Sequence, residues 1–207
     1  MGANQEWLQC DTKTFWGDVA ADDHVVQLYD NENVLIATLA DFATGGFKCG
    51  SSVVVIATED HLAKLDEELL SFGFDLEYLM AFDQYIRLDA EQTLAKFMVN
   101  GSPDEKYFLE TIKPIIERAR KNGRQVRAFG EMVALLWARG NNKATLHLEA
   151  LWNKFFEEQT FCLFCAYPKS VFENDPRAAV MHICGAHTHL LKTSEDFPSH
   201  IQYKKIV

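Results

Sequence analysis

Residues 51–58 read SSVVVIAT, and residues 59–73, EDHLAKLDEELLSFG, follow them directly. The first stretch is a continuous run of mostly β-branched residues, which is typical of a strand buried on both faces of a parallel sheet. The second stretch repeats leucine at a helical spacing, with Thr58 placed to cap its first turn and Gly73 placed to end it. A buried strand that passes into an amphipathic helix is the repeating unit of an α/β fold.

The same alternation recurs on both sides of this unit. It predicts further strands at 24–29, 85–89, 124–130 and 160–168, and further helices at 33–46, 90–101, 102–123, 131–139 and 143–159. Strands that alternate with helices in this way form a mostly parallel central sheet with helices on both faces. The fold class that we predict is therefore α/β.

Local signals place the ends of several of these helices. Gly45 and Gly46 are expected to end the first helix, and Asp89 is expected to cap the helix that follows it. Ser102, followed by a proline and then an acidic residue, has the pattern of an N-cap. Pro114 is expected to kink or break the helix in which it lies.

The composition of the chain limits its partners. The 207 residues, of which 48% are hydrophobic and 24% charged, suit one large globular domain. The net charge of −10 disfavours direct binding to nucleic acid. No apolar run approaches the roughly 20 residues that span a bilayer, and the N-terminus lacks the layout of a secretory signal. We expect a cytoplasmic protein without a membrane partner.

One segment departs from the acidic balance. Residues 113–127 contain six basic residues and one glutamate, a local charge of +5. Two interpretations remain open: a solvated helix end whose cations complement the helix dipole, or a docking patch for an acidic partner.

The cysteines and histidines include a set that resembles a zinc site: Cys162, Cys165, His182, Cys184, His187 and His189. The C-x-x-C pair lies inside a predicted strand, however, where residues three apart face opposite sides of the sheet. A zinc knuckle needs both thiolates on the inner side of a tight turn. We therefore interpret these cysteines as buried and reduced, and predict no metal and no cofactor. The segment HICGAHTH, residues 182–189, remains an alternative site for a metal or a ligand.

Motifs of nucleotide hydrolysis are missing. The pattern G-x-x-x-x-G-K-[ST] does not occur, and its nearest imitation, GGFKCGSS at 45–52, follows a helix and precedes a strand. A phosphate loop needs the reverse order, so that helix N-terminal amides point at the anion. No serine or cysteine has an identifiable catalytic histidine and acid beside it. Glu131 and Asp89 could act as acid or base, but carboxylates at strand ends are more often helix caps. We predict that the protein is not an enzyme.

The first strand and its following corner, DDHVVQLYDNEN at 22–33, carry a histidine and a tyrosine where α/β proteins often hold phosphate. His24 and Tyr29 are five residues apart, so a regular strand sends them to opposite faces. They can share a site only if the strand ends near Leu28 and the chain turns at Tyr29. In the alternative, His24 lies at the start of the strand and Tyr29 is packed with its hydroxyl at the surface.

Several segments together resemble one family. HVVQLYDNENVLIATLADFATGGFKCGSSVVVIATEDH, LDAEQTLAKFMVNGSPDEKYF, VRAFGEMVALLWARGN, LEALWN and CAYP are similar to the MEDS sensory domain, named for methanogens, methylotrophs and a dichloromethane-responsive regulator. The resemblance covers about Asp22 to Pro168. It implies a three-layer sandwich of the RecA/KaiC type that has lost its phosphate-binding loop. It also implies a signature histidine and tyrosine on the first strand, which His24 and Tyr29 match, and a sensor of hydrocarbon derivatives coupled to histidine kinases or transcription regulators.

The resemblance leads to a division into an N-terminal extension (1–21), a sensory domain (22–168) and a C-terminal extension that packs on the same domain (169–207). We predict a non-catalytic sensor in prokaryotic signal transduction, which binds a small organic ligand at the carboxyl ends of the strands. His24 and Tyr29 would supply polar contacts, and Arg127, Glu131 and Tyr167 would line the neighbourhood. Its output would pass through a histidine kinase, a transcription regulator or a homodimer. Two alternatives are a degenerate nucleotide-binding protein and a partner-switching interaction protein with a vestigial cleft.

Overall fold

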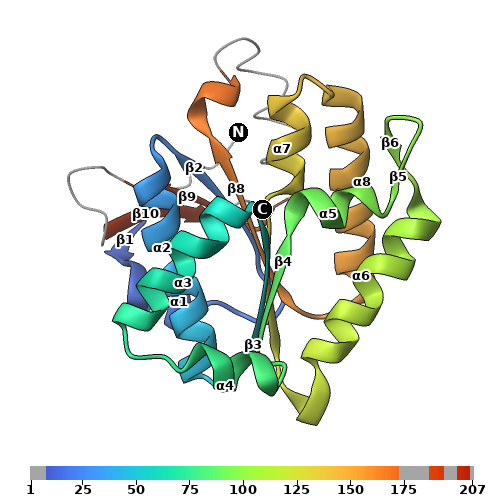
Figure 1. Cartoon of the computed structure of the whole chain (residues 1–207). Helices are drawn as coiled ribbons and strands as arrows, with labels where there is room; N and C mark the ends of the chain where they lie inside the picture. Colours follow the sequence, from blue (N-terminus) through green and yellow to red (C-terminus); the bar gives the residue numbers. More distant parts are fainter. Residues whose placement is uncertain (1–7, 173–186, 194–199, 206–207) are drawn as a thin grey trace.

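An eight-stranded sheet runs through the middle of the protein, in the order β1-β10-β9-β2-β8-β7-β3-β4 (Figure 1). The structure is a computed structural model that describes residues 8–172, 187–193 and 200–205. Strands β9, β2, β8, β7, β3 and β4 are parallel, and β10 and β1 continue the sheet antiparallel. The strands of the sheet are β1 (Leu8–Asp11), β2 (His24–Tyr29), β3 (Ser52–Ala57), β4 (Tyr85–Asp89), β7 (Val126–Gly130), β8 (Cys162–Pro168), β9 (His189–Thr193) and β10 (His200–Lys205).

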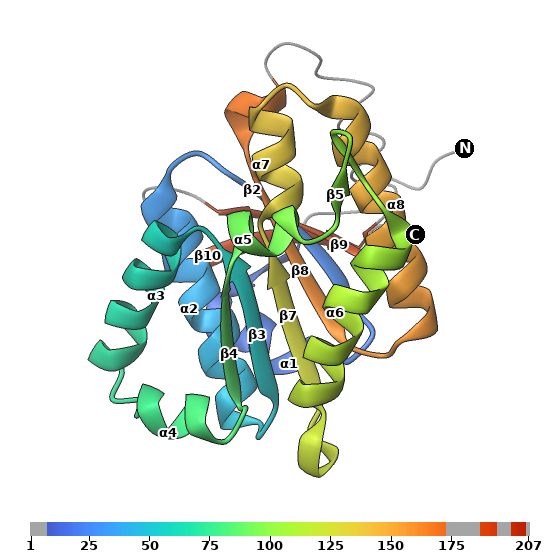
Figure 2. The same cartoon turned by 45° about the vertical axis from the view of Figure 1, so that its right-hand side comes forward.

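Helices cover both faces of this sheet, as predicted. One face carries α1 (Thr12–Asp18), α2 (Glu32–Lys48), α3 (Glu59–Ser71) and α4 (Leu76–Ala81). The other carries α5 (Ala90–Ala95), α6 (Glu105–Ala119), α7 (Met132–Ala138) and α8 (Asn142–Glu158). Figure 2 separates the layers, with α2 and α3 on one side of β3, β4 and β7, and α6 and α8 on the other. None of the helices in the described ranges is long and apolar enough to cross a membrane.

Strand β3 is the centre of the core. All six of its residues are buried, and alternate side chains enter the two apolar clusters on either side of the sheet. Val53 and Val55 pack under α2 and α3, whereas Val54 and Ile56 pack under α6. Each such side chain contributes about 1.5–3 kcal/mol by leaving water. This confirms the prediction of a strand buried on both faces.

Gly45 and Gly46 were expected to end α2, but the helix continues past them. The helix ends at Lys48. Gly45 and Gly46 lie at a close approach between the helix and its neighbours. A Cβ atom on Gly46 would meet the Cγ2 atom of Val53 at 2.7 Å and the Cδ atom of Arg127 at 3.1 Å. These glycines therefore serve close packing rather than a turn.

The start of α6 also differs from its prediction. Asp104, not Ser102, caps the helix by accepting a hydrogen bond from the backbone N–H of Tyr107. The segment before it forms a two-stranded hairpin, β5 (Met98–Val99) and β6 (Ser102–Pro103), so the preceding helix ends at Ala95 rather than near residue 101. In contrast, Thr58 and Asp89 cap α3 and α5 as predicted.

Pro114 neither breaks nor ends α6, which runs from Glu105 to Ala119. Pro114 and Glu110, whose carbonyl would otherwise accept the missing hydrogen bond, lie on the exposed side of the helix. Water can therefore satisfy that carbonyl. The buried stripe of Phe108, Ile112 and Ile116 continues past the proline and holds the helix against the sheet. Short 3-10 helices follow at Lys121–Gly123 and Lys169–Phe172.

Candidate functional site

The carboxyl ends of β2, β3, β7 and β8 form one edge of the sheet, which we call the carboxyl edge. At this edge the chain leaves β3 into α3 on one face and leaves β7 into α7 on the opposite face. Because β3 and β7 are neighbours, their ends form a topological switch point, the position at which open α/β sheets bind ligands. The backbone N–H of Glu131, just after β7, donates to the carbonyl oxygen of Ile56 at 2.9 Å and ties the two strand ends together.

Glu131 is the centre of a polar network at this switch point. Its side chain makes no capping bond to α7. Instead, its carboxylate accepts from the backbone N–H of Thr58 at 3.0 Å and contacts Nδ1 of His61 at 2.9 Å. The Nε2 atom of His61 reaches Oε1 of Glu32 at 2.7 Å, and Glu32 pairs with Nζ of Lys64 at 2.5 Å. We call Glu131, His61, Glu32 and Lys64 the Glu131 network.

Burial and charge differ along this network. The side chain of Glu131 is 7% exposed, whereas that of Glu32 is 41% exposed. The hydrogen bond to Glu131 raises the pKa of His61, with Glu32 adding to the effect against desolvation. The bond from Lys64 lowers the pKa of Glu32. The network therefore joins a buried carboxylate to the surface through an imidazole that favours its charged form.

Tyr29 ends β2 beside this network and is half-buried. Desolvation, followed by the charges of Glu131 and Glu32, raises the pKa of its hydroxyl to about 12. The phenol therefore stays protonated and can donate a hydrogen bond at neutral pH. Tyr29 and Glu131 are the two predicted site residues that the structure places together.

The corner after β2 satisfies its own backbone groups. Asn31 caps α2, and its Oδ1 atom accepts from the N–H of Val34 at 3.0 Å. Asp30 is paired with Lys169. At the start of α3, the carboxylate of Glu131 accepts a hydrogen bond from the backbone N–H of Thr58, which could otherwise bind an anion. Asn31 and Glu131 thus each engage a backbone amide that could otherwise bind an anion at these two helix N-termini.

His24 and Tyr29 do not share a site. Strand β2 stays regular over all six of its residues, so the condition for bringing them together, a turn at Tyr29, is not met. His24 faces Phe156 of α8, with ring centroids 5.1 Å apart, whereas Tyr29 packs on the opposite face. The period of the strand, which places residues five apart on different faces, accounts for the separation.

Arg127 and Tyr167 have buried side chains away from the Glu131 network, although Tyr167 is the penultimate residue of β8. The guanidinium of Arg127 donates from Nη1 to the carbonyl oxygen of Trp16 at 2.8 Å, beneath α1 and α2. Desolvation lowers its pKa. Tyr167 is fully buried on the other face and donates to the carboxyl group of Glu149. Both are structural contacts in the described part of the chain.

The two cysteines of the C-x-x-C pair face opposite clusters, which confirms the strand interpretation. Cys162 packs under α2, and Cys165 packs under α8. Cys165 nevertheless meets two histidines: its Sγ atom lies 3.6 Å from Nε2 of His24, and His187 lies beside both. We call His24, Cys165 and His187 the histidine–cysteine cluster. His182 and Cys184, from the same predicted set, lie outside the described residues.

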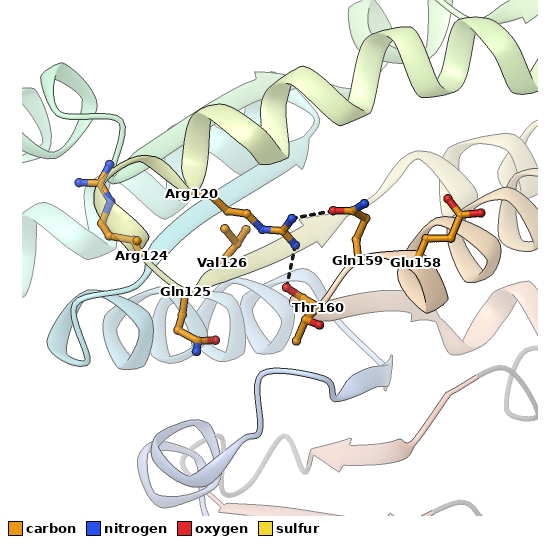
Figure 3. A pocket seen from close by; sticks show the side chains of 8 residues that line it. Arg120, Arg124, Gln125, Val126, Glu158, Gln159 and Thr160 are labelled. Atoms are coloured by element: carbon orange, nitrogen blue, oxygen red, sulfur yellow. Dashed lines mark hydrogen bonds between the residues drawn. The ribbon is translucent and has the colours of Figure 1, made fainter.

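The basic segment is largely engaged within the chain. Arg118 and Lys121 pair with Asp83, and Arg120 donates to Oε1 of Gln159 at 2.6 Å and to the carbonyl of Thr160 at 2.8 Å. These contacts favour the helix-end interpretation over a docking patch. The contacts of Arg120 with Gln159 and Thr160 border an open, polar cavity of about 380 Å³ at the amino ends of β7 and β8 (Figure 3), at the opposite edge of the sheet from the Glu131 network.

Sequence reasoning missed His61, Glu32 and Lys64. His61 and Glu32 lie in the first turns of α3 and α2, the helices that follow β3 and β2. Their position directly after two strands of the carboxyl edge was the signal that could have identified them. It missed the pairing of His24 with Cys165 as well, because the β2–β8 register that aligns Val26 with Cys165 is a property of the fold.

Comparison with known structures places the fold. A KaiC-like protein from the hyperthermophilic archaeon Pyrococcus horikoshii OT3 is similar, with a TM-score of 0.57 and 15% identity over 84% of this chain and 74% of that one. A second protein from Pyrococcus horikoshii OT3 is similar, with a TM-score of 0.59 and 12% identity over 90% of this chain and 89% of that one. These likenesses confirm the predicted KaiC-like sandwich and, at such identities, concern the fold alone.

Comparison of sequences identifies the family. Among curated protein sequences, none matches the chain significantly. The family model described as the methanogen/methylotroph, DcmR sensory domain (MEDS) matches residues 23–188, which extends past Pro168, the expected end of the sensory domain. Because this match covers most of the 207 residues, the chain belongs to the MEDS family of sensory domains.

Proposed function

We propose that this protein is a non-catalytic sensor that binds a small organic molecule at the carboxyl edge, against Tyr29 and the exposed end of the Glu131 network. The observation that carries the proposal is the network itself, a buried carboxylate at the switch point that is linked through His61 to the half-exposed Glu32. Polar groups that converge at this position of an α/β sheet are typical of a ligand site. Membership of a sensory family supports a binding role.

The chemistry of the edge limits the ligand. Glu32, Glu131 and Asp60 place carboxylates around the network, which disfavours nucleotide phosphates and other polyanions. Tyr29 offers an aromatic surface and a neutral hydroxyl. A compact hydrocarbon derivative with one hydroxyl or amino group fits both features, and the resemblance to the MEDS family supports the same class.

The network also offers a route from binding to output. The contact between His61 and Glu32 joins α3 to α2 across the carboxyl edge. A ligand that hydrogen-bonds Glu32 competes with His61 and changes how firmly α3 is held to α2. Such a ligand stabilises one arrangement of the two helices over the other, which a histidine kinase, a transcription regulator or a second copy could detect.

Native mass spectrometry of the freshly purified full chain tests the binding site. A retained small molecule is expected in the wild type and in the control Tyr107→Phe, an exposed tyrosine on α6. It should be lost or reduced at least tenfold in Tyr29→Phe and Glu32→Gln, which remove about 1.4 kcal/mol or more of polar contact. Retention that is equal in all four proteins would contradict the site.

A thermal-shift assay provides the complementary test with defined probes. Short alcohols and amines should raise the Tm of the wild type more than that of Tyr29→Phe. ATP with Mg²⁺ should leave the Tm unchanged. Tight ATP binding with turnover would overturn the proposal and favour the degenerate nucleotide-binding alternative.

A second candidate function is that of an interaction protein that pairs with a second copy of itself. Large apolar side chains are exposed at the end of α3, on the loop after it, on α4 and directly after α4: Leu70, Phe72, Tyr78, Met80 and Phe82. Surface patches of this kind mark protein interfaces. Sedimentation equilibrium should show a dimer that Phe82→Ser weakens; a monomer at all concentrations would remove this candidate.

A further inference from the structure

The histidine–cysteine cluster lies at the end of β2 that is remote from the carboxyl edge. His24 begins β2, Cys165 lies in the neighbouring strand β8, and His187 lies two residues before β9, the strand on the other side of β2. All three residues are almost fully buried, with exposures of 1%, 3% and 4%. Their potential ligand atoms lie within 4.8 Å of one another.

The backbone fixes His24 and the chain at His187 against each other. The N–H of Thr188 donates to the carbonyl oxygen of His24 at 2.6 Å, and the N–H of His24 donates to the hydroxyl of Thr188 at 2.9 Å. The rings of His24 and His187 are 3.9 Å apart between centroids. His24 and Cys165 are therefore held by strands of the sheet, and His187 is joined to β2 through the backbone of Thr188.

One distance in the cluster matches that of a tetrahedral metal site. Zinc binds sulfur at about 2.3 Å and imidazole nitrogen at about 2.0–2.1 Å, which places the two ligand atoms about 3.6 Å apart at a tetrahedral angle. The separation between Sγ of Cys165 and Nε2 of His24 is 3.6 Å. The sulfur and nitrogen atoms thus have the spacing that one shared ion requires.

We propose that His24, Cys165 and His187 bind a zinc-class transition-metal ion, with a water molecule or an external ligand in the fourth position. Two imidazoles and a thiolate suit Zn²⁺ and its softer neighbours, and they do not suit Mg²⁺ or Ca²⁺, which take oxygen ligands. On binding, the Cys165 thiol releases its proton to solvent and its sulfur forms the bond to the metal. The two imidazoles bind as neutral donors.

This site is separate from the proposed ligand site. It uses the other end of β2 and the opposite face of the sheet, and shares no residue with the Glu131 network. The ion would join β2 and β8 to the chain that enters β9. Loss of the metal is therefore expected to loosen the attachment of 187–193 while leaving Tyr29 in place.

Titration of the tag-free full chain with Co²⁺, in the presence of a phosphine reductant, tests the proposal. Wild-type protein should bind one Co²⁺ per chain, with visible d–d bands and a thiolate-to-cobalt charge-transfer band, and Zn²⁺ should displace it. The control Cys162→Ser, a buried cysteine on the same strand that faces the other cluster, should behave like the wild type.

Two variants remove single ligands. Cys165→Ser should lose the charge-transfer band. Both Cys165→Ser and His187→Gln should bind Co²⁺ about 100-fold more weakly or worse, because even outer-shell changes cost about 10–100-fold in metal affinity. Far-ultraviolet circular dichroism checks that each variant is folded. If Cys165→Ser does not fold, the Co²⁺ affinity of His187→Gln tests the proposal. A wild type without the charge-transfer band, or a folded ligand variant with unchanged affinity, would overturn the proposal.

Discussion

Glu149 is expected to make the stability of the protein fall as pH rises. Its carboxyl group is fully buried in α8 beneath the sheet, where it accepts a hydrogen bond from Tyr167. Desolvation raises its pKa from 4.5 to about 7. The native state therefore holds a proton that the unfolded state releases between these two values, so the free energy of unfolding decreases with pH across this window and stays low above it.

The size of the effect follows from the two pKa values. Each pKa unit corresponds to 1.36 kcal/mol, so the rise from 4.5 to about 7 amounts to roughly 3 kcal/mol at pH 8. Glu149→Gln keeps the shape and an oxygen that accepts from Tyr167, but it cannot ionise. The variant should match the wild type within about 0.5 kcal/mol near pH 4.5 and exceed it by up to roughly 3 kcal/mol at pH 8.

Urea unfolding at several pH values between 4.5 and 8, with EDTA present to keep the protein free of metal, measures this difference. Glu157→Gln, at an exposed position of the same helix, is the matched control and should follow the wild type at every pH. A stability difference between Glu149→Gln and the wild type that is the same at pH 5 and pH 8 would refute the reasoning. A difference that grows as pH falls would refute it as well.

Three further predictions concern the switch point and the helix ends. In an NMR titration, the pKa of His61 should lie above 6.5 and should be lower in Glu131→Gln. The contribution of this contact to the free energy of unfolding is complete below pH 6.5 and is lost as pH rises through the native pKa. Gly46→Ala should lower the free energy of unfolding by about 1–3 kcal/mol, because the clash with the sheet outweighs the gain in helix propensity, and a more stable variant would contradict this. Asp104→Ala should cost about 1 kcal/mol in urea unfolding, whereas Ser102→Ala should cost less than about 0.5 kcal/mol; equal losses would argue against Asp104 as the cap.

The central layers of the fold could be predicted because their signals are local. The apolar run of β3, the cap at Thr58 and the leucine repeat of α3 each act within a few residues, and they agree with one another. Strands β9 and β10 lie in the stretch after Pro168 that was not assigned, because their pairing depends on partners far away in the sequence. Gly46 misled the prediction of α2 for the same reason, since only the packed sheet shows why a helix needs a glycine there.

The candidate site could be predicted in part. Tyr29 ends one strand and Glu131 follows another, and strand ends of a parallel sheet meet at one edge, so their proximity follows from the sequence. His61 and Glu32 could not be assigned, because polar residues in the first turn of a helix are common and only the fold brings these two together. For His24 the strand period indicated separation from Tyr29, whereas the family resemblance indicated a shared role; the period was correct about the geometry.

The pairing of β1 with β10 has a consequence for how the protein is made. Leu8 lies opposite Tyr203 and Asp11 opposite His200, so residues 8–11 can form this ladder only after residues 200–203 have been synthesised. Closing so long a loop is slow relative to pairing nearby strands. During translation β2 and β8 can assemble earlier, with the outer side of β2 exposed until β9 arrives. Protection of that edge during synthesis is therefore a task for other segments of the chain or for chaperones.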